Sequence, residues 1–231
     1  MIVKTFILWR KHETQHSYTT LAAIAMLGIN ALTPTFASDS PMTIEASKNL
    51  YHGYTAKNAN GTINVVVEIP AGTNAKYEVN TKTGNLDWEI KKGKPRMVKY
   101  LAYPANYGMI PSTLSDPDNG GDGDPLDVLL LGESKPQASV VEAKLIGVMN
   151  MLDNGEVDDK LIAVAKDSCF ADINTVTELE KKFNGSTKVL KTWFENYKGK
   201  KANVKIAGFK DATEANQILD NAIAGFKKHE K

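Results

Sequence analysis

The chain is poor in several features that often define a function. Its 231 residues include one cysteine, Cys169, which excludes an intrachain disulfide and any zinc or iron–sulfur site built from several thiolates. The four histidines are scattered along the chain without a metal-binding spacing: His12, His16, His52 and His229. The formal net charge is +1, from 28 basic and 27 acidic residues, so the composition gives no sign of a protein that binds nucleic acid.

An apolar run long enough to cross a bilayer, about 20 residues, is missing as well. The alanine-rich run at residues 21–32 is shorter and follows several basic residues, and Thr35 and Ala37 suit the small-residue positions of a signal-peptidase site. We therefore predict that residues 1–37 are a cleaved export signal. The mature protein would be periplasmic or secreted, without a stable membrane anchor. An organelle transit peptide, an uncleaved anchor and a cytoplasmic location remain as alternatives.

What the chain does have is the composition of a folded domain. Hydrophobic residues make up 42 % and charged residues 24 %, which leaves enough apolar side chain for a core in one domain spanning residues 38–231. Short β-branched or alternating runs bounded by turn residues indicate strands. These predicted strands are residues 63–69, 75–79, 127–131, 140–149 and 161–164. Several short strands with frequent turns are typical of a small barrel or a strongly curled sheet.

The C-terminal part of the chain changes to a helical period. Thr175 and Glu178 form a capping-box pattern, which predicts that a helix begins there. Apolar and aromatic residues then recur at helical spacing over residues 190–197, and residues 211–226 repeat this pattern after an acidic start. Strands therefore precede helices, and we predict an α+β fold with a mainly β core.

The densest chemical feature is the loop at residues 120–127, GGDGDPLD. Its glycine and proline residues favour a turn that can bring Asp127 beside Asp122. Two like charges about 4 Å apart repel by about 4 kcal/mol at an effective dielectric constant near 20. A hard divalent cation removes that repulsion, and oxygen ligands suit Mg²⁺. A second acidic turn at residues 153–160 lies between two predicted strands, so the two turns can form a site for several metal ions.

The acidic loop has two other interpretations. An EF-hand calcium loop beginning at Asp118 does not fit, because its third ligand position would be Gly120 and its twelfth would be Leu129. A plain solvated turn is the simpler interpretation of the loop alone, since Asp and Gly are common turn residues. The direct continuation into the apolar run at residues 127–131 and the second acidic turn favour a metal site.

Cationic and phenolic side chains accompany the acidic loops. Lys76 and Glu78 share one face of a predicted strand. The other candidates are an arginine, three tyrosines and a lysine: Arg96, Tyr103, Tyr107, Tyr197 and Lys198. Each of them alone is typical of a surface or of the edge of a core. Only their combination with the acidic loops indicates a site for an anion.

Together these residues resemble the family I soluble inorganic pyrophosphatases. The family's signature D-x-D-P-x-D is present here as Asp122-Gly-Asp124-Pro-Leu-Asp127. Five further segments are similar and follow in the family's order: residues 67–70, 74–78, 103–111, 153–160 and 197–198. The resemblance implies a five-stranded, OB-like β-barrel with helices packed outside. It also implies Mg²⁺-dependent hydrolysis of pyrophosphate to two phosphates by activated water, without a covalent intermediate.

The resemblance implies several Mg²⁺ ions per active site, replaceable by Mn²⁺ or other divalent ions. Six carboxylates would hold or surround them: Asp122, Asp127, Asp153, Asp158, Glu68 and Glu78. Asp122, Asp127 and Asp158 would hold the first ion, and Asp127 would also touch the second. Asp153 and Asp158 would take the ions that arrive with substrate. Glu68 would belong to the outer acidic set, and Glu78 would be a further residue of the metal site.

The remaining implied roles concern the substrate. Asp124 would accept a proton from the attacking water. Seven side chains would bind the phosphates: Lys76, Arg96, Tyr103, Tyr107, Lys160, Tyr197 and Lys198. Among these, Tyr107, Arg96 and Lys198 would share in catalysis with Asp124. The family also implies a homo-oligomer, either a dimer or a hexamer. The near-neutral charge and the acidic cleft disfavour a nucleic-acid partner.

Two competing functions stay open at this point. The first is a metal-dependent phosphohydrolase that acts on nucleotides or polyphosphate, although no base- or ribose-binding element stands out. The second is an exported, non-catalytic metal-binding module, which would not need the cationic side chains. Cys169 has no histidine near it in the sequence to activate it, so we expect a buried or half-buried structural thiol.

Overall fold

The computed structural model describes residues 40–199 and 202–229, so the predicted export signal at residues 1–37 lies outside the described residues. The described strands are β1 (Thr43–Ile44), β2 (Ile63–Ile69), β3 (Tyr77–Val79), β4 (Leu86–Trp88), β5 (Ile90–Lys91), β6 (Lys94–Pro95), β7 (Asn106–Met109), β8 (Asp127–Leu131), β9 (Val140–Asp153), β10 (Glu156–Val157), β11 (Lys160–Ala165) and β12 (Val204–Asp211). The described helices are α1 (Val176–Lys182), α2 (Ser186–Asn196) and α3 (Ala212–His229), together with a 3₁₀ turn, η1 (Pro117–Asn119).

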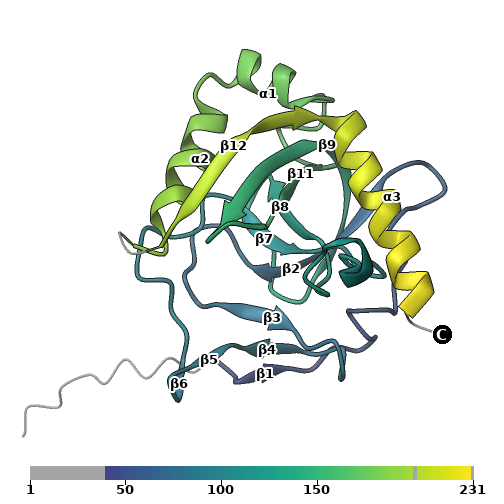
Figure 1. Ribbon diagram of the computed structural model, residues 1–231, viewed down its shortest axis with the longest axis vertical. Coiled ribbons are helices and arrows are strands. Elements are labelled where there is room, and N and C mark those ends of the chain that lie inside the picture. The colour runs from purple at the N-terminus through teal and green to yellow at the C-terminus, as the bar shows by residue number, and fades with distance from the viewer. Residues whose placement is uncertain (1–39, 200–201, 230–231) are drawn as a thin grey trace, which may run out of the picture. The chain divides into compact units, whose positions relative to one another are not determined.

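Five strands close into a ring at the centre of the fold (Figure 1). Hydrogen-bonded neighbours follow the order β9, β11, β8, β7 and β2, and β2 pairs back onto β9. Within the ring, β8 and β11 run parallel, whereas the other neighbouring strands are antiparallel. Closure leaves the ring without an unpaired edge. The predicted mainly β core, with a five-stranded barrel and helices outside, is confirmed.

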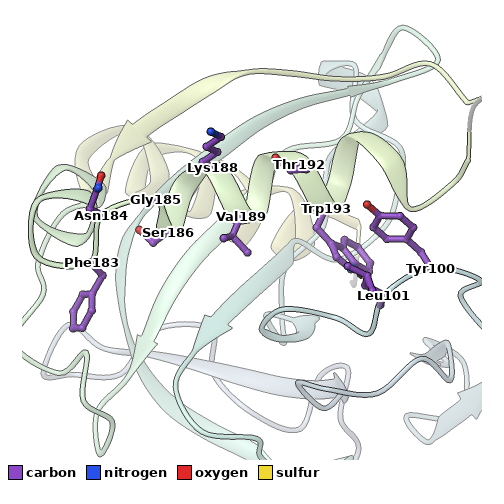
Figure 2. A pocket seen from close by; sticks show the side chains of 10 residues that line it. All are labelled: Tyr100, Leu101, Phe183, Asn184, Gly185, Ser186, Lys188, Val189, Thr192 and Trp193. Carbon is purple, nitrogen blue, oxygen red and sulfur yellow. Dashed lines mark hydrogen bonds between the residues drawn. The ribbon is translucent and has the colours of Figure 1, made fainter. Parts of the chain in front are cut away.

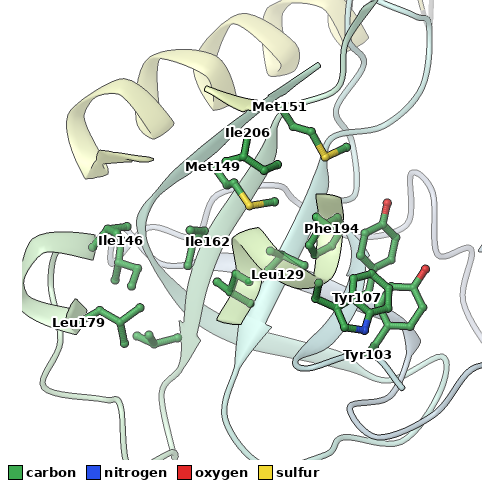
Figure 3. Close-up of a cluster of buried hydrophobic side chains, with 14 of the residues drawn as sticks. Tyr103, Tyr107, Leu129, Ile146, Met149, Met151, Ile162, Leu179, Phe194 and Ile206 are labelled. Carbon is green, nitrogen blue, oxygen red and sulfur yellow. The ribbon is translucent and has the colours of Figure 1, made fainter. Parts of the chain in front are cut away.

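Both faces of the ring strands are buried, which explains why they form continuous apolar runs. In β8, Leu129 belongs to one buried cluster, while Val128 and Leu130 belong to another. The first cluster, drawn in Figure 3, continues into the aromatic and aliphatic side chains of α1 and α2. The second continues into Ala215 and Leu219 of α3. Successive side chains of a strand point to opposite faces, so a ring strand such as β8 contributes to both apolar clusters.

Helices cover the ring on two sides, with α1 and α2 on one and α3 on the other (Figure 1). The predicted helix start at Thr175 is present, because the Thr175 hydroxyl accepts a hydrogen bond of 3.0 Å from the backbone N–H of Glu178. The predicted last helix is also present as α3. No described helix is long and apolar enough to cross a membrane.

A smaller sheet, in the order β1, β4, β3, packs beside the ring over its own apolar cluster. Next to it, β5 and β6 form a two-residue hairpin through Lys92 and Gly93, whose φ angles are 52° and 73°. Positive φ at both central residues is the geometry of a type I′ turn. The hairpin places Glu89 opposite Arg96, and the Arg96 N–H donates to the Glu89 carbonyl at 2.8 Å.

The structure also departs from the sequence-based expectations. Strand β12 was not predicted, although it pairs with β9 along most of its length. Strand β9 continues to Asp153, four residues beyond its predicted end. The thiol of Cys169 is exposed, so the expectation of a buried or half-buried thiol was wrong. The turn after β11 leaves this side chain in solvent and buries the neighbouring Ser168 hydroxyl, which donates to the Ala165 carbonyl at 2.7 Å.

Candidate active site

The pairing of β8 with β11 brings the two acidic turns together. Asp127 is the first residue of β8, and the register places Leu161 of β11 opposite Val128. The starts of the two parallel strands therefore lie side by side, with Asp158 just before β11. Lys160, which is 2 % exposed, donates through Nζ to the carboxylates of both Asp127 and Asp158. Two segments more than 30 residues apart thus share one buried ammonium group.

A cavity of about 180 Å³ lies next to the carboxylates of Asp127 and Asp158. Six of its lining side chains are carboxylates: Glu68, Glu78, Asp122, Asp124, Asp127 and Asp158. Lys76 and Tyr107 complete the polar wall, with the Lys76 ammonium 2.6 Å from Glu78 Oε1 and 5.0 Å from the centre of the Tyr107 ring. All the oxygen ligands are hard donors, and no thiolate or imidazole of the described part of the chain lines the cavity, so the donor set fits Mg²⁺.

The pKa values of the cavity residues are set by burial and by the excess of carboxylates over ammonium groups. Burial raises the pKa of Glu68 to about 8, although Lys76 and the backbone N–H of Val79 act in the opposite direction. Burial acts the same way on Asp127, but the ammonium groups of Lys160 and Lys76 outweigh it and lower the pKa of Asp127. The raised pKa of Glu68 reflects its burial in a cluster that holds more carboxylates than its lysines can neutralise. A divalent cation would provide the missing positive charge.

Asp124 occupies a distinct position within the cavity. Its pKa is raised by burial and by the negative charges of Asp122 and Asp127. Its backbone N–H donates to Asp122 Oδ1 at 3.0 Å, so a local turn connects the two aspartates. A carboxylate with a raised pKa accepts a proton more readily than an ordinary aspartate. The position and the direction of the pKa shift both suit a proton acceptor.

A second group of side chains lies outside the cavity wall, and we call it the outer group: Arg96, Tyr103, Tyr197, Lys198 and Asp153. The ring centres of Tyr103 and Tyr107 lie 5.4 Å apart, which joins the outer group to the cavity. Burial raises the pKa of Tyr103 and of Tyr107 well above the usual range, so both phenols remain hydrogen-bond donors. Tyr197 stacks on Trp193 with ring centres 4.8 Å apart, which fixes its orientation at the end of α2.

Both cations of the outer group are paired with carboxylates. Arg96 Nη1 lies 2.5 Å from Glu89 Oε2, and Lys198 Nζ donates to Asp153 Oδ2. The structure therefore places Asp153, a predicted metal ligand, beside Lys198 and not in the cavity wall. The other five predicted metal-binding carboxylates line the cavity.

Sequence analysis missed Glu89, the partner of Arg96. A signal for it was available, because Lys92-Gly93 is a typical hairpin turn and its register pairs residue 89 with residue 96. Thr81 and Gln137 were missed as well: Thr81 lines the cavity, and Gln137 Nε2 donates to the Glu68 carbonyl at 3.0 Å. No local pattern marks either residue, since their contacts come from distant parts of the chain.

A different cluster forms a candidate acidic metal site, because one ligand atom each from Asp116, Asp118 and His229 lie within 4.8 Å of one another. None of the residues predicted as metal ligands belongs to it. The Lys228 ammonium lies 2.5 Å from Asp118 Oδ2 and 3.1 Å from Asp116 Oδ2. A lysine thus already supplies positive charge there, and we interpret the cluster as an ion-pair network.

A larger surface pocket, of about 790 Å³, lies between the start of α2 and residues 100–101. Figure 2 shows that Phe183, Val189, Trp193 and Leu101 form much of its lining. Among the described residues, no carboxylate lines it, and Lys188 is the single charged residue there. Although it is larger, this apolar pocket lacks the cluster of carboxylates that lines the smaller cavity, as far as the described residues go.

The fold and the smaller cavity together place the chain among the enzymes that act on small, highly charged phosphate compounds. The carboxylates supply oxygen ligands for hard cations, and the adjacent lysines, arginine and phenols supply donors for phosphate oxygens. The cavity is also smaller than the roughly 300–1,000 Å³ that is usual for pockets that enclose drug-sized ligands.

Comparisons with known proteins identify the family. The family model for inorganic pyrophosphatase matches residues 65–227. The inorganic pyrophosphatase of Campylobacter jejuni is 39 % identical over 171 residues, which cover 71 % of this chain and 92 % of the relative. The corresponding Helicobacter pylori enzyme (strain 26695) is 38 % identical over 168 residues, covering 71 % and 90 %.

Solved structures agree with this result. The type I inorganic pyrophosphatase from Toxoplasma gondii matches with a TM-score of 0.73 and 27 % identity, covering 78 % of this chain and 88 % of that one. The Thermus thermophilus enzyme matches with a TM-score of 0.66 and 30 % identity, covering 78 % and 99 %. The chain belongs to the family I inorganic pyrophosphatases, and it is an enzyme that hydrolyses inorganic pyrophosphate. The family is known to depend on Mg²⁺.

Proposed function

We propose that hydrolysis takes place in the 180 Å³ cavity, with Mg²⁺ held by Asp122, Asp127 and Asp158. The observation that carries this proposal is the convergence of six carboxylates in one wall, with a buried lysine beneath two of them. Glu68 and Glu78 would complete the acidic surroundings. Bound divalent ions would neutralise the substrate's charge and make a water molecule more acidic. Mn²⁺ or another divalent ion would substitute for Mg²⁺.

Asp124 would accept the proton of the attacking water. Its raised pKa supports this role, because proton transfer is most efficient when the pKa of the acceptor approaches the working pH. Its backbone also supports the role, since the Asp124 carbonyl accepts a hydrogen bond of 2.8 Å from the Ser115 N–H, which holds the turn. No covalent intermediate is needed, and the exposed Cys169 has no role in the reaction.

The phosphates would be bound on two sides. Lys76 and Tyr107 would act from the cavity wall and Lys160 from beneath it, and all three are buried and oriented by carboxylates or rings. Arg96, Tyr103, Tyr197 and Lys198 would act from the outer group. There, the substrate would draw Arg96 from Glu89 and Lys198 from Asp153. The release of Asp153 would allow it to hold an ion that arrives with the substrate.

The test is release of phosphate from pyrophosphate with Mg²⁺ and with a chelator, for the wild-type chain and for Asp122→Asn. Asp172→Asn is the matched control, because it removes the same charge from a side chain that is 91 % exposed. We expect the chelator and Asp122→Asn to abolish most release and the control to retain it. ATP and tripolyphosphate as substrates test the small size of the site, and release from them at the pyrophosphate rate would contradict it.

We further propose that the mature enzyme spans residues 38–231, is exported after removal of residues 1–37, and forms a homo-oligomer, either a dimer or a hexamer. The apolar pocket in Figure 2 supports assembly, because Leu101 is 70 % exposed and Val189 is 57 % exposed. N-terminal sequencing of the mature protein would test the cleavage site. Light scattering would test the assembly, and a monomer at all concentrations would contradict it.

A further inference from the structure

We propose that α3 positions the loop that carries the active-site aspartates, and that Asp116, Lys228 and Gly225 are positioning residues for pyrophosphate hydrolysis. We call residues 114–126, which connect β7 to β8, the aspartate loop. This inference rests on the proposed function, because it assumes that Asp122 and Asp124 on this loop act in the cavity. It assigns a role in the reaction to a helix that contributes no residue to the cavity wall.

The aspartate loop is held at its base by its own hydrogen bonds. The Thr113 hydroxyl accepts from the Leu126 N–H at 3.0 Å, and the Ile110 N–H donates to the Leu126 carbonyl at 3.0 Å. Further out, the Gly123 N–H donates to the Ser115 carbonyl at 2.9 Å. These contacts define the shape of the loop and attach its base to β7 and β8, but they do not fix its outer part against the rest of the protein.

Contacts with α3 provide that attachment. The Leu114 N–H donates to the Ala222 carbonyl at 3.0 Å, although Ala222 lies in the middle of the helix. At the end of α3, Lys228 Nζ reaches the carboxylates of Asp116 and Asp118, and His229 Nε2 lies 2.9 Å from Asp116 Oδ1. These contacts join residues more than 100 positions apart in the sequence.

Asp116 connects these contacts to the loop. Its carboxylate also accepts from the backbone N–H of Asp118 at 3.0 Å and from Asn119 Nδ2 at 2.9 Å, so it caps η1. Although partial desolvation acts in the opposite direction, hydrogen bonds from His229, Asp118 and Lys228 lower the pKa of Asp116 to about 2. Asp116 therefore remains charged, and keeps these partners, at neutral pH.

Gly225 allows the helix to approach the loop this closely. A Cβ atom at this position would lie 2.8 Å from the Leu114 carbonyl oxygen and 3.0 Å from Asp116 Cβ. The nearer atom belongs to the backbone, so it could not move aside as the end of a flexible side chain does. An alanine at position 225 would push α3 away from the part of the loop that Lys228 holds.

The space behind the loop makes this attachment more important. A cavity of about 690 Å³ lies between Gly120, Gly121 and Leu126 on one side and Ile218 and Ala222 of α3 on the other. Side chains therefore do not fill the space under the middle of the aspartate loop. Its position depends on the contacts at Leu114 and Asp116, and small displacements of catalytic groups reduce activity strongly.

The test compares Lys228→Met and Gly225→Ala with Asp220→Asn in the full chain. Asp220 is the matched control, because it is also on α3 and forms an ion pair with Lys57, 2.6 Å away, that does not involve the aspartate loop. The readouts are Mg²⁺ binding measured by calorimetry without substrate, kcat and KM for pyrophosphate, and hydrogen exchange over residues 114–126. Thermal unfolding monitors the folded state.

We expect Lys228→Met and Gly225→Ala to weaken Mg²⁺ binding about tenfold, as removal of residues that orient ligands usually does. The same variants should exchange amide hydrogens faster over the aspartate loop. Their kcat should fall by a larger factor than their KM changes. Lys228→Arg should restore most of the affinity, and Asp220→Asn should match the wild type. Lys228 is half exposed, and Asp116 keeps its hydrogen bonds from the Asp118 N–H and Asn119 without it, so Lys228→Met should unfold near the wild-type temperature.

Wild-type Mg²⁺ affinity and loop exchange in Lys228→Met would overturn the inference, even if Gly225→Ala fails to fold. An equal effect of Asp220→Asn would overturn it as well. Failure of the proposed function is distinguishable, because the wild-type chain would then bind no Mg²⁺, or Asp127→Asn would bind it as tightly as the wild type does. If Asp127→Asn loses binding and Lys228→Met does not, only the role of α3 is wrong.

Discussion

The cavity and the outer group differ in how their charges are held. Beneath the cavity, Lys160 is 2 % exposed and lies between the carboxylates of Asp127, in β8, and Asp158, just before β11. In the outer group, the side chain of Lys198 is 26 % exposed and comes from the residues that follow α2. The base of the cavity is therefore assembled by the hydrogen-bonded ring, while β3 and the aspartate loop supply the rest of its wall. The outer group instead depends on a hairpin, a loop and the end of a helix.

This difference suggests a division of labour in the proposed reaction. The carboxylates that would hold Mg²⁺ are fixed before any ligand arrives, which favours metal binding because little rearrangement is needed. The outer cations instead begin in ion pairs with Glu89 and Asp153, which the substrate must replace. Changes in the cavity should therefore affect metal binding and catalysis most, and changes in the outer group should mainly affect how the substrate is held.

The largest effect is expected for Asp127→Ala. It removes a central carboxylate and leaves Lys160 paired with Asp158 alone. Metal ions stabilise transition-state charge by several kcal/mol, so we expect kcat/KM to fall by about a thousandfold or more. Calorimetry should show weaker Mg²⁺ binding. Wild-type Mg²⁺ dependence in this variant would contradict the proposed difference between the cavity and the outer group, because the cavity would then not be where Mg²⁺ binds.

Asp124→Asn is expected to have the next largest effect. It keeps the size and the polarity of the side chain but cannot accept the proton, and general bases usually contribute about 10²–10⁴-fold to a rate. We expect kcat to fall by that amount while Mg²⁺ and pyrophosphate still bind. Steady-state kinetics and calorimetry measure the two properties separately. Unchanged turnover across pH would show that Asp124 is not the base.

Lys198→Ala tests the outer group. Hydrogen bonds to charged groups contribute about 1.5–3 kcal/mol, so we expect a loss in kcat/KM of about tenfold to a hundredfold, expressed mainly in KM. Lys166→Ala is the control, since that lysine is 65 % exposed and pairs with Glu142 at 3.5 Å. Wild-type kinetics in Lys198→Ala would mean that the residue only pairs with Asp153.

The smallest effect concerns stability in acid. The pKa of Asp116 is about 2 in the folded chain against an ordinary value of 3.8, so the folded state favours the charged form. The stability that Asp116 contributes is therefore present above about pH 4 and is lost as the pH falls towards 2. Urea unfolding at several pH values should show the wild type approaching Asp116→Asn in acid. A constant difference between them would contradict this.

Much of the ring could be predicted from the sequence, because its strands have strong local signals. The β-branched run of β2 and the apolar run of β8 have the predicted bounds. Strand β12 was missed because Ala207 and Gly208 interrupt its pattern, and the structure has a register shift there. Strand β7 contains Gly108, and a Cβ at that position would lie 1.8 Å from the Val66 carbonyl oxygen. A short strand in which a glycine allows the neighbouring backbone to come close has a weak β-propensity, so its sequence gives little indication of a strand.

The candidate site was predictable as a set of residues but not as an arrangement. Motif order and spacing grouped the acids of the two turns with the cations, and five of the six predicted metal-binding carboxylates do line one cavity. The pairing of Lys198 with Asp153 and of Lys228 with Asp116 could not be anticipated. Those contacts depend on how α2 and α3 pack, which no local pattern in the sequence specifies.

Strand β9 has a consequence for the whole enzyme. It hydrogen-bonds to β2 and β11 within the ring and to β10 and β12 outside it. Any fluctuation that frees this one strand must open the barrel, detach β12 from its neighbour and separate the acidic hairpin that carries Asp153 and Asp158. The proposed active site and the scaffold therefore belong to one cooperative unit, so local unfolding of β9 would also disrupt that site.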